Sequence, residues 1–290
     1  MFGDLGAEDL GWLLIDEAGQ ASPQYAAGAI WRARRVVAVG DPLQLEPVVT
    51  VPNKMLHDIA ATYHLSSTWI PPKASVQTLA DRVSKFGTVL PQGDEDLWVS
   101  APLKVHRRCD DPMFSLCNEI AYNNMMINGV SDRAAADADD PFVSRGQEPD
   151  VAWSYWADER AQTSGTHLQH NEIQRFEKAM AYLQHNGVDA SQVIAISPFR
   201  DVADRLAALQ SQYPGLLAGT IHTAQGREAP VVILVLGGDP KRPGAKAWAA
   251  SSVNLVNVAA SRAKRRLFVI GDRREWSKHN YFRQLSDALN

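Results

Sequence analysis

The sequence predicts an α/β fold in which parallel strands are flanked by helices. Short apolar runs rich in β-branched residues recur along the chain, each bounded by a turn, at 12–15, 36–39, 193–196, 231–236 and 267–270. Continuous apolar runs are typical of strands buried on both faces, as in parallel sheets covered by helices. Helical segments lie between several of these runs, and this alternation indicates an open α/β sheet.

Two of the intervening segments have the spacing of an amphipathic helix. Between 166 and 187 the apolar residues at helical spacing are Ile173, Phe176, Met180 and Leu183. Gly187 stands where the C-terminal cap of that helix is expected. After Phe199 a second set, at i, i+4 and i+7, consists of Val202, Leu206 and Leu209.

Two stretches interrupt the alternation and suggest how the chain divides. Residues 129–150 are rich in Ala and Asp and predict an exposed loop, whereas residues 50–100 predict an irregular connector with one or two short helices. At about 100–200 residues per domain, 290 residues form one large domain or two modest ones. We expect one domain with its connector over 1–100 and a second over 101–290.

Composition excludes some classes of protein without identifying a partner. The 29 basic and 33 acidic residues give a net charge of −4, which excludes a wholly basic nucleic-acid coat protein but allows a local basic groove. No apolar run approaches the ~18–20 residues of a membrane span, and no signal-peptide pattern opens the chain. We therefore expect a cytoplasmic protein that does not bind membranes. The 2 cysteines are too few for a disulfide framework or a thiolate zinc site.

Polar side chains with catalytic potential follow the first two predicted strands. In open α/β sheets ligands bind at the carboxyl ends of the strands. Asp16 and Glu17 form the acidic pair with which nucleotide hydrolases hold Mg²⁺ and orient the attacking water, although such a pair also caps helices. After the second run, a turn at 40–42 precedes Gln44, a neutral donor suited to sensing a γ-phosphate. An ordinary strand-end turn is the alternative there.

Three further elements bring basic and polar groups together. The segment 105–109 can place a guanidinium on phosphate oxygens, or it is a solvated basic face. In 219–228, small residues allow the backbone to approach a ligand closely beside several polar functions. In 257–267, Arg262 ends a predicted helix just before the last strand and can act on transition-state phosphate charge. We interpret Lys264, Arg265 and Arg266 as basic residues that the helix dipole favours at a helix C-terminus.

In chain order, these five elements resemble motifs II to VI of superfamily 1 helicases. The resemblance is to the 5′-to-3′ group (SF1B) that includes the nonsense-decay and Okazaki-processing helicases, and its closest signatures are at 16–20, 40–45, 225–228 and 258–263. It extends from about residue 13 to about residue 272. The resemblance implies a RecA-like P-loop NTPase fold with two motor domains, the second complete and the first partial, and with ATP and Mg²⁺ in the cleft between them.

The resemblance also implies roles for individual residues. Asp16 would coordinate Mg²⁺, Glu17 would position the hydrolytic water, and Gln44 would contact the γ-phosphate. Arg108 and Arg262 would reach the γ-phosphate from the second domain. The loop linking the nucleotide to the strand would contain Gln225, Gly226 and Glu228. The residues that would contact the backbone of single-stranded DNA or RNA are Ser197, Pro198, Arg200, Thr220 and His222.

The sequence departs from the family pattern in two places. Arg107 and Cys109 stand where the family has an aromatic residue and a Met beside the motif IV Arg. No Gly-x-x-x-x-Gly-Lys-[Ser/Thr] segment occurs, and the family pattern places it upstream of Asp16. The first domain would then expose apolar surface and a strand edge.

Three functional readings follow. We expect the C-terminal part of an ATP-dependent helicase, inactive as an ATPase without the phosphate-loop segment, with the missing N-terminal half as a separate chain among its expected partners. One alternative is a non-catalytic relative that binds nucleic acid or protein. A metal-dependent nuclease using Asp16 and Glu17 ranks last, because no further carboxylates gather at matching strand ends. Whether the chain alone is an enzyme stays open among these readings.

Overall fold

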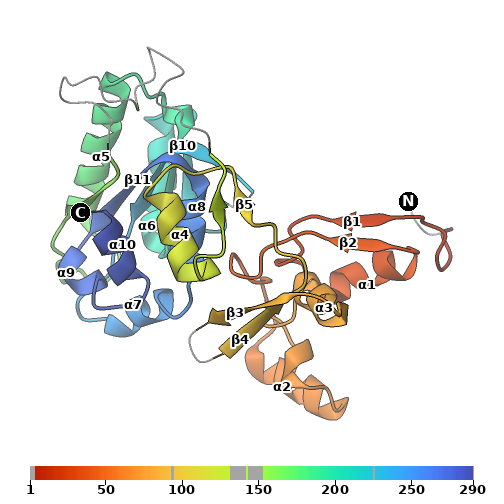
Figure 1. Cartoon of the computed structure of the whole chain (residues 1–290). Helices are drawn as coiled ribbons and strands as arrows, with labels where there is room; N and C mark the ends of the chain where they lie inside the picture. Colours follow the sequence, from red (N-terminus) through yellow and green to blue (C-terminus); the bar gives the residue numbers. More distant parts are fainter. Residues whose placement is uncertain (1–3, 93–94, 131–141, 143–152, 225, 290) are drawn as a thin grey trace. The chain divides into compact units, whose positions relative to one another are not determined.

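The chain divides into two compact units, Met1–Pro102 and Leu103–Asn290, which we describe separately. Our computed structural model describes residues 4–92, 95–130, 142, 153–224 and 226–289, drawn in colour in Figure 1. Most of the loop expected at 129–150 lies outside the described residues.

The first unit begins with a strand–helix–strand element and ends in an antiparallel hairpin. Strand β1 (Leu13–Ile15) pairs in parallel with β2 (Val36–Ala38), and helix α1 (Pro23–Trp31) connects them. The elements that follow are α2 (Asn53–Thr62), the 3-10 helix η1 (Ser67–Trp69), α3 (Val76–Val83), β3 (Thr88–Gln92) and β4 (Glu95–Val99). The short helices expected in the connector are therefore present. The β3–β4 hairpin was not predicted by the sequence pattern.

Strands β1 and β2 are not buried on both faces, contrary to the prediction from their apolar sequence. Leu14 exposes 72% of its surface, and Val36 and Val37 are also exposed. In the described part of the chain these two strands form a sheet of their own. The buried cluster beside them is small and consists of Ala18, Ala26 and Val76. The unit therefore exposes apolar strand surface.

The second unit is built on a parallel sheet of five strands in the order β7-β11-β10-β8-β9. These strands are β7 (Tyr155–Asp158), β8 (Val193–Ser197), β9 (Leu217–Thr220), β10 (Ala229–Val235) and β11 (Ala263–Gly271). Every residue of β8 is buried, as are most residues of β10 and β11. The prediction of doubly covered strands is therefore confirmed for this unit.

Helices flank the sheet of the second unit (Figure 1). Helix α5 packs against β10 and β11, and α8 packs against the same two strands and against α4. The helices are α4 (Met113–Tyr122), α5 (His170–His185), α6 (Arg200–Ala208), α7 (Pro243–Ala249), α8 (Asn254–Arg262), α9 (Arg273–Trp276) and α10 (Phe282–Ala288). Shorter elements are the parallel pair β5 (Val105–His106) and β6 (Ile127–Asn128) and the 3-10 helices η3 (Ala190–Gln192) and η4 (Leu209–Ser211).

Both helices that the sequence predicted are present. The apolar residues at helical spacing on α5, from Ile173 to Leu183, are buried. Gly187 follows the helix with φ +81°, and the N–H of Val188 donates to the Leu183 carbonyl at 2.9 Å, which closes the C-terminus as predicted. Among the helices described, none is both long and apolar enough to cross a membrane.

Candidate functional site

The acidic pair of the first unit lies in the turn at the carboxyl end of β1, where it was expected. Asp16 is exposed, and its Oδ1 accepts the Glu17 N–H at 2.9 Å. Glu17 has φ +52°, a conformation that costs about 1–3 kcal/mol, and its Oε2 accepts from Gln20 Nε2 at 2.9 Å. Helix α1 starts only at Pro23 and has no acidic residue in its first turn. The helix-cap alternative for this pair is therefore wrong.

The turn after β2 packs directly against the turn that carries the acidic pair. A Cβ on Gly40 would lie 2.5 Å from Gly19 N, and a Cβ on Gly19 would lie 2.6 Å from the Asp41 carbonyl oxygen. The N–H of Ala18 also donates to the Val39 carbonyl at 2.9 Å. Because both positions lack a side chain, the two backbones can touch. The structure therefore brings motifs II and III together at one end of the sheet.

Asp41 orients Gln44, a role that the sequence did not reveal. Its Oδ2 accepts from Gln44 Nε2 at 3.1 Å, and its Oδ1 accepts the Leu43 N–H at 2.9 Å. An Asp that accepts backbone N–H bonds two residues onward is a common turn device, so the signal lay in the Asp-Pro-Leu-Gln order. Gln44 is half-buried and is held in one orientation by the turn that precedes it.

In the second unit, a carboxylate near the start of β10 holds two cations from distant segments. Glu228 Oε2 lies 2.6 Å from Arg108 Nε, and Glu228 Oε1 lies 2.5 Å from Lys264 Nζ. We call these three residues the Glu228 cluster. The hydrogen bond from Lys264 and the nearby charge of Arg108 lower the pKa of Glu228, so the group is ionised at neutral pH. Each side chain of the cluster stays partly exposed to solvent.

The segment around Arg108 is fixed against the junction of α8 and β11. Arg108 Nη1 donates to the Ser261 carbonyl at 3.3 Å, and the Asp110 N–H donates to the Lys264 carbonyl at 2.9 Å. The N–H of Cys109 donates to His106 Nε2 at 2.8 Å. Burial, and then the charge of Arg108, lower the pKa of His106, which favours the neutral ring that this bond requires. The reading of 105–109 as a solvated basic face is therefore wrong for Arg108.

The interpretation of Lys264, Arg265 and Arg266 as basic residues at a helix C-terminus is wrong. Helix α8 ends at Arg262 and β11 begins at the next residue, so Lys264, Arg265 and Arg266 lie on a strand. Lys264 binds Glu228, and Arg265 Nε lies 3.0 Å from Asp110 Oδ2. Arg266 donates to the Phe142 carbonyl, and its guanidinium lies over the Phe142 ring. Arg262 itself is buried, with 2% of its surface exposed.

The residues expected to contact nucleic acid lie at the carboxyl ends of two neighbouring strands. Ser197 at the end of β8 pairs in register with Thr220 at the end of β9. Ser197 is fully buried, and its Oγ accepts the Phe199 N–H at 3.2 Å, so this hydroxyl shapes the turn. Arg200 and His222 are exposed at this edge. Pro198 and Thr220 are half-buried.

Glu228 and Arg262 lie at the amino ends of strands in the same sheet. Glu228 directly precedes β10, and Arg262 directly precedes β11, as their order in the sequence predicted. Ser197 and Thr220 lie at the carboxyl ends of their strands. The loop 221–228 connects the carboxyl end of β9 to the amino end of β10. Gly226 in this loop has φ +65° and is exposed, whereas Gln225 lies outside the described residues.

Residues 84–274 match the AAA domain family, which is more than half of the chain. The chain belongs to the AAA domain family. This AAA domain protein is 25% identical over 285 residues to a regulator of nonsense transcripts 1 homolog of Neurospora crassa, covering 94% of this chain and 23% of that protein. It is 26% identical over 298 residues to the ATP-dependent helicase NAM7 of Saccharomyces cerevisiae, covering 94% of this chain and 26% of that protein.

The AAA domain chain therefore spans about a quarter of the length of these curated relatives. Among solved structures it is similar to the arterivirus nonstructural protein 10 (helicase) in complex with DNA. The identity is 15%, the coverage is 95% of this chain and 43% of that chain, and the TM-score is 0.44. The family match and the curated relatives confirm the relationship to superfamily 1 helicases. The five-stranded parallel sheet flanked by helices confirms the α/β class.

Proposed function

We propose that this AAA domain chain is the C-terminal part of a DNA or RNA helicase that couples ATP hydrolysis to movement along single-stranded nucleic acid. The observation that supports it best is the Glu228 cluster. Arg108 belongs to motif IV, Glu228 to motif V and Lys264 follows motif VI, and ion pairs join all three. The bond from Arg108 to Ser261 spans 153 positions of sequence. Motifs read separately from the sequence thus meet in one place.

The first unit would supply the residues that act on the phosphates and the water. Mg²⁺ in nucleotide sites is usually held by one or two carboxylates together with phosphate oxygens and water. The exposed carboxylate of Asp16 fits that donor set, and the described residues contain no group of three or more metal-binding side chains that suggests a protein-only site. Bound Mg²⁺ would neutralise phosphate charge. Glu17 would orient the attacking water, and Gln44, fixed by Asp41, would donate to the γ-phosphate.

The second unit would supply positive charge to the γ-phosphate. Arg108 and Arg262 are the candidates, and Glu228 sets the direction of the Arg108 guanidinium. A guanidinium held in place by a carboxylate loses less conformational freedom when it binds phosphate than a freely rotating one. In the loop 221–228, which contains Glu228, Gly226 would allow the backbone to approach the nucleotide closely, and Gln225 is proposed to act beside it.

The nucleic-acid strand would bind at the carboxyl edge of β8 and β9. Arg200 and His222 offer exposed cationic or hydrogen-bonding groups there, while Ser197, Pro198 and Thr220 shape the edge. Contacts of this kind address the phosphate backbone, so binding should be tolerant of sequence and weakened by salt.

Strand binding tests this part of the proposal. A labelled oligonucleotide of ~20 nucleotides, as DNA and as RNA, is titrated with the chain at low salt and at several-fold higher salt. We expect a steep loss of affinity with salt, and a several-fold loss at fixed salt for Arg200→Ala and for His222→Ala. Arg205→Ala is the matched control, because Arg205 is also exposed on α6. Absence of any shift at low salt would refute strand binding at this edge.

Hydrolysis tests the catalytic part. The chain contains no Gly-x-x-x-x-Gly-Lys-[Ser/Thr] segment, so the chain by itself lacks the usual Lys and backbone nest for the β- and γ-phosphates. We expect little ATP turnover by the chain alone and restored turnover when a separate chain containing that segment is added. Robust turnover by the chain alone that Glu17→Gln abolishes would overturn the first expectation. Strand binding without restored turnover would favour a non-catalytic relative.

A further inference from the structure

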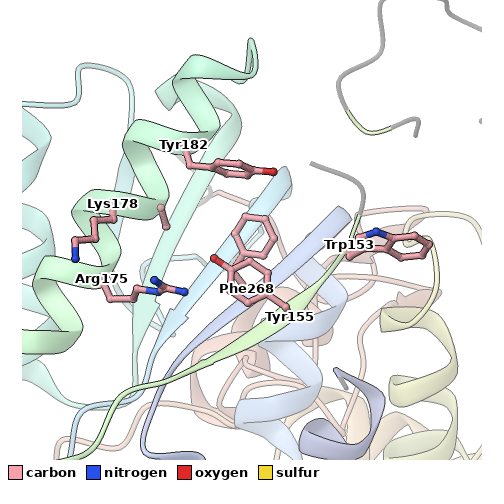
Figure 2. Close-up of a pocket in the computed structure, with 7 residues that line it drawn as sticks. Trp153, Tyr155, Arg175, Lys178, Tyr182 and Phe268 are labelled. Carbon is pink, nitrogen blue, oxygen red and sulfur yellow. The ribbon is translucent and has the colours of Figure 1, made fainter. Parts of the chain in front are cut away.

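The second unit contains a pocket of about 330 Å³ beside its edge strand β7 (Figure 2). In the strand order β7-β11-β10-β8-β9, the outer strands are β7 and β9. The pocket therefore lies beside the outer strand that is farther from β8 and from the proposed nucleic-acid site. Its volume is at the lower end of the ~300–1,000 Å³ usual for ligand pockets, which suits a small ligand. The residues that line it are Trp153, Tyr155, Arg175, Lys178, Ala179, Tyr182 and Phe268.

Helix α5 forms one wall of the pocket. Its residues form two stripes along the helix, and only the second lines the pocket. The first stripe, from Ile173 to Leu183, fills the core. The second, at i, i+3, i+4 and i+7, begins at Arg175 and ends at Tyr182, and it lines the pocket. Ala179 in the middle of this stripe is small, so the helix approaches the sheet without filling the space between them.

Aromatic rings form the floor. Tyr155 on β7 pairs in register with Phe268 on β11, so the two side chains lie on the same face, and their ring centroids are 4.8 Å apart. Phe268 is 1% exposed and belongs to the core, whereas Trp153, two residues before Tyr155, exposes 77% of its surface. The pocket therefore offers flat apolar surfaces that reach from the core to solvent.

A cation points into the pocket. Figure 2 shows the guanidinium of Arg175 directed toward Tyr155, while the ammonium of Lys178 is directed away from the rings. The Nε–H of Arg175 is buried and has no hydrogen-bond acceptor among the described residues. Arg175 also forms an ion pair with Glu159, whose Oε1 lies 4.0 Å from that nitrogen. The Arg175 side chain as a whole lines the pocket and keeps 40% of its surface exposed, so its guanidinium can donate to a ligand there.

We propose that this pocket binds a nucleobase that carries a phosphate. Every base has a flat π-face that stacks on aromatic side chains, and a guanidinium is the preferred partner of a phosphate oxygen. The rings and the cation occur together here, and the seven lining residues include two cations and no acid. The chemistry is shared by a free mononucleotide and by one nucleotide of a single strand. The inference does not rest on the proposed function.

The experiment titrates the full chain with AMP by isothermal calorimetry. Adenosine, which has the base but no phosphate, and ribose 5-phosphate, which has the phosphate but no base, are titrated separately. We expect saturable AMP binding and weaker binding of either of these halves alone. Arg175→Gln should weaken AMP binding about tenfold, the loss expected when a charge-assisted hydrogen bond is removed. Lys178→Gln removes the same charge from the same helix but should change AMP binding by less than about threefold. A thermal melt establishes that each variant is folded.

A second arm separates the two sources of the ligand. A short single strand is titrated in competition with AMP against the wild-type chain and Arg175→Gln. Displacement of AMP by the strand, lost in Arg175→Gln, assigns the pocket to a nucleotide of the strand, whereas AMP binding without displacement assigns it to a free nucleotide. Both outcomes support the proposal. Absence of saturable AMP binding, or equal losses in Arg175→Gln and Lys178→Gln, overturns it. Strand binding that depends on Arg200 but not on Arg175 would keep the proposed function while removing this inference.

Discussion

A buried carboxylate in α5 makes the stability of the second unit depend on pH in an unusual direction. Glu172 has 0% exposure, its Oε2 accepts the Gly237 N–H at 2.7 Å, and its Oε1 has no partner among the described residues. Burial raises the pKa of Glu172 from 4.5 to about 8, although the Gly237 bond and the charge of Lys246 act in the opposite direction. The group is therefore mostly protonated in the folded chain at neutral pH.

The sign follows from proton counting. Between pH 4.5 and about 8 the unfolded chain has lost this proton while the folded chain keeps it, so the free energy of unfolding falls as pH rises. The contribution is fully present below the unfolded pKa and is lost as pH approaches the folded value. At ~1.4 kcal/mol for each pH unit, the whole interval amounts to about 5 kcal/mol.

Glu172→Gln removes the titration and keeps an oxygen to accept the Gly237 N–H. We expect the variant to lose this pH dependence, so that its stability relative to wild type improves by several kcal/mol between about pH 5 and about pH 9. Urea unfolding followed by circular dichroism at a series of pH values measures this difference. Glu177→Gln, a half-buried carboxylate on the same helix, is the matched control and should keep the wild-type slope. Equal slopes in Glu172→Gln and wild type would refute the reasoning.

Three further predictions concern the two units. Gly40→Ala should destabilise the first unit by about 1–3 kcal/mol, because the added Cβ would lie 2.5 Å from Gly19 N. Gly11→Ala is the control and should not destabilise the unit, because no atom lies within 4 Å of its added Cβ. Urea unfolding compares the two variants. Glu228→Gln should cost less than about 1 kcal/mol per lost pair at neutral pH. Because the pKa of Glu228 is lowered, the wild-type advantage in urea unfolding should be present above pH 4.5 and disappear in acid. Hydrogen exchange should be faster in β1 and β2 than in β8 and β10, and equal protection would contradict the exposure of the first sheet.

The sequence predicted the fold best where an element's own residues decide its environment. The apolar runs of β8, β10 and β11 and the stripe on α5 needed no information beyond their spacing. The burial of β1 and β2 was predicted wrongly, because an apolar run shows what a strand can bury but not whether neighbours cover it. The hairpin at 88–99 was missed because Pro91 and the acidic residues at the start of β4 weaken the strand pattern.

The places of the candidate residues on strands and turns could in part be predicted from the sequence, but their contacts could not. Asp16, Glu17 and Gln44 were placed correctly at strand ends because the strands before them were recognised. The ion pair between Glu228 and Lys264 was missed because α8 passes into β11 without a turn, so Lys264 was assigned to a helix end. The absence of Gly, Pro or Asn between Arg262 and Leu267 was a signal for that direct junction.

The uncovered sheet of the first unit also determines how the isolated chain should behave at high concentration. Trp12, Leu14 and Val37 present apolar surface on a short sheet whose described strands pair with each other alone. Open strand edges bearing such surface favour self-association between copies. Any surface that normally covers β1 and β2 competes with this pairing. The tendency of the purified chain to dimerise or aggregate is therefore a measure of how much of the surface of β1 and β2 stays exposed in solution.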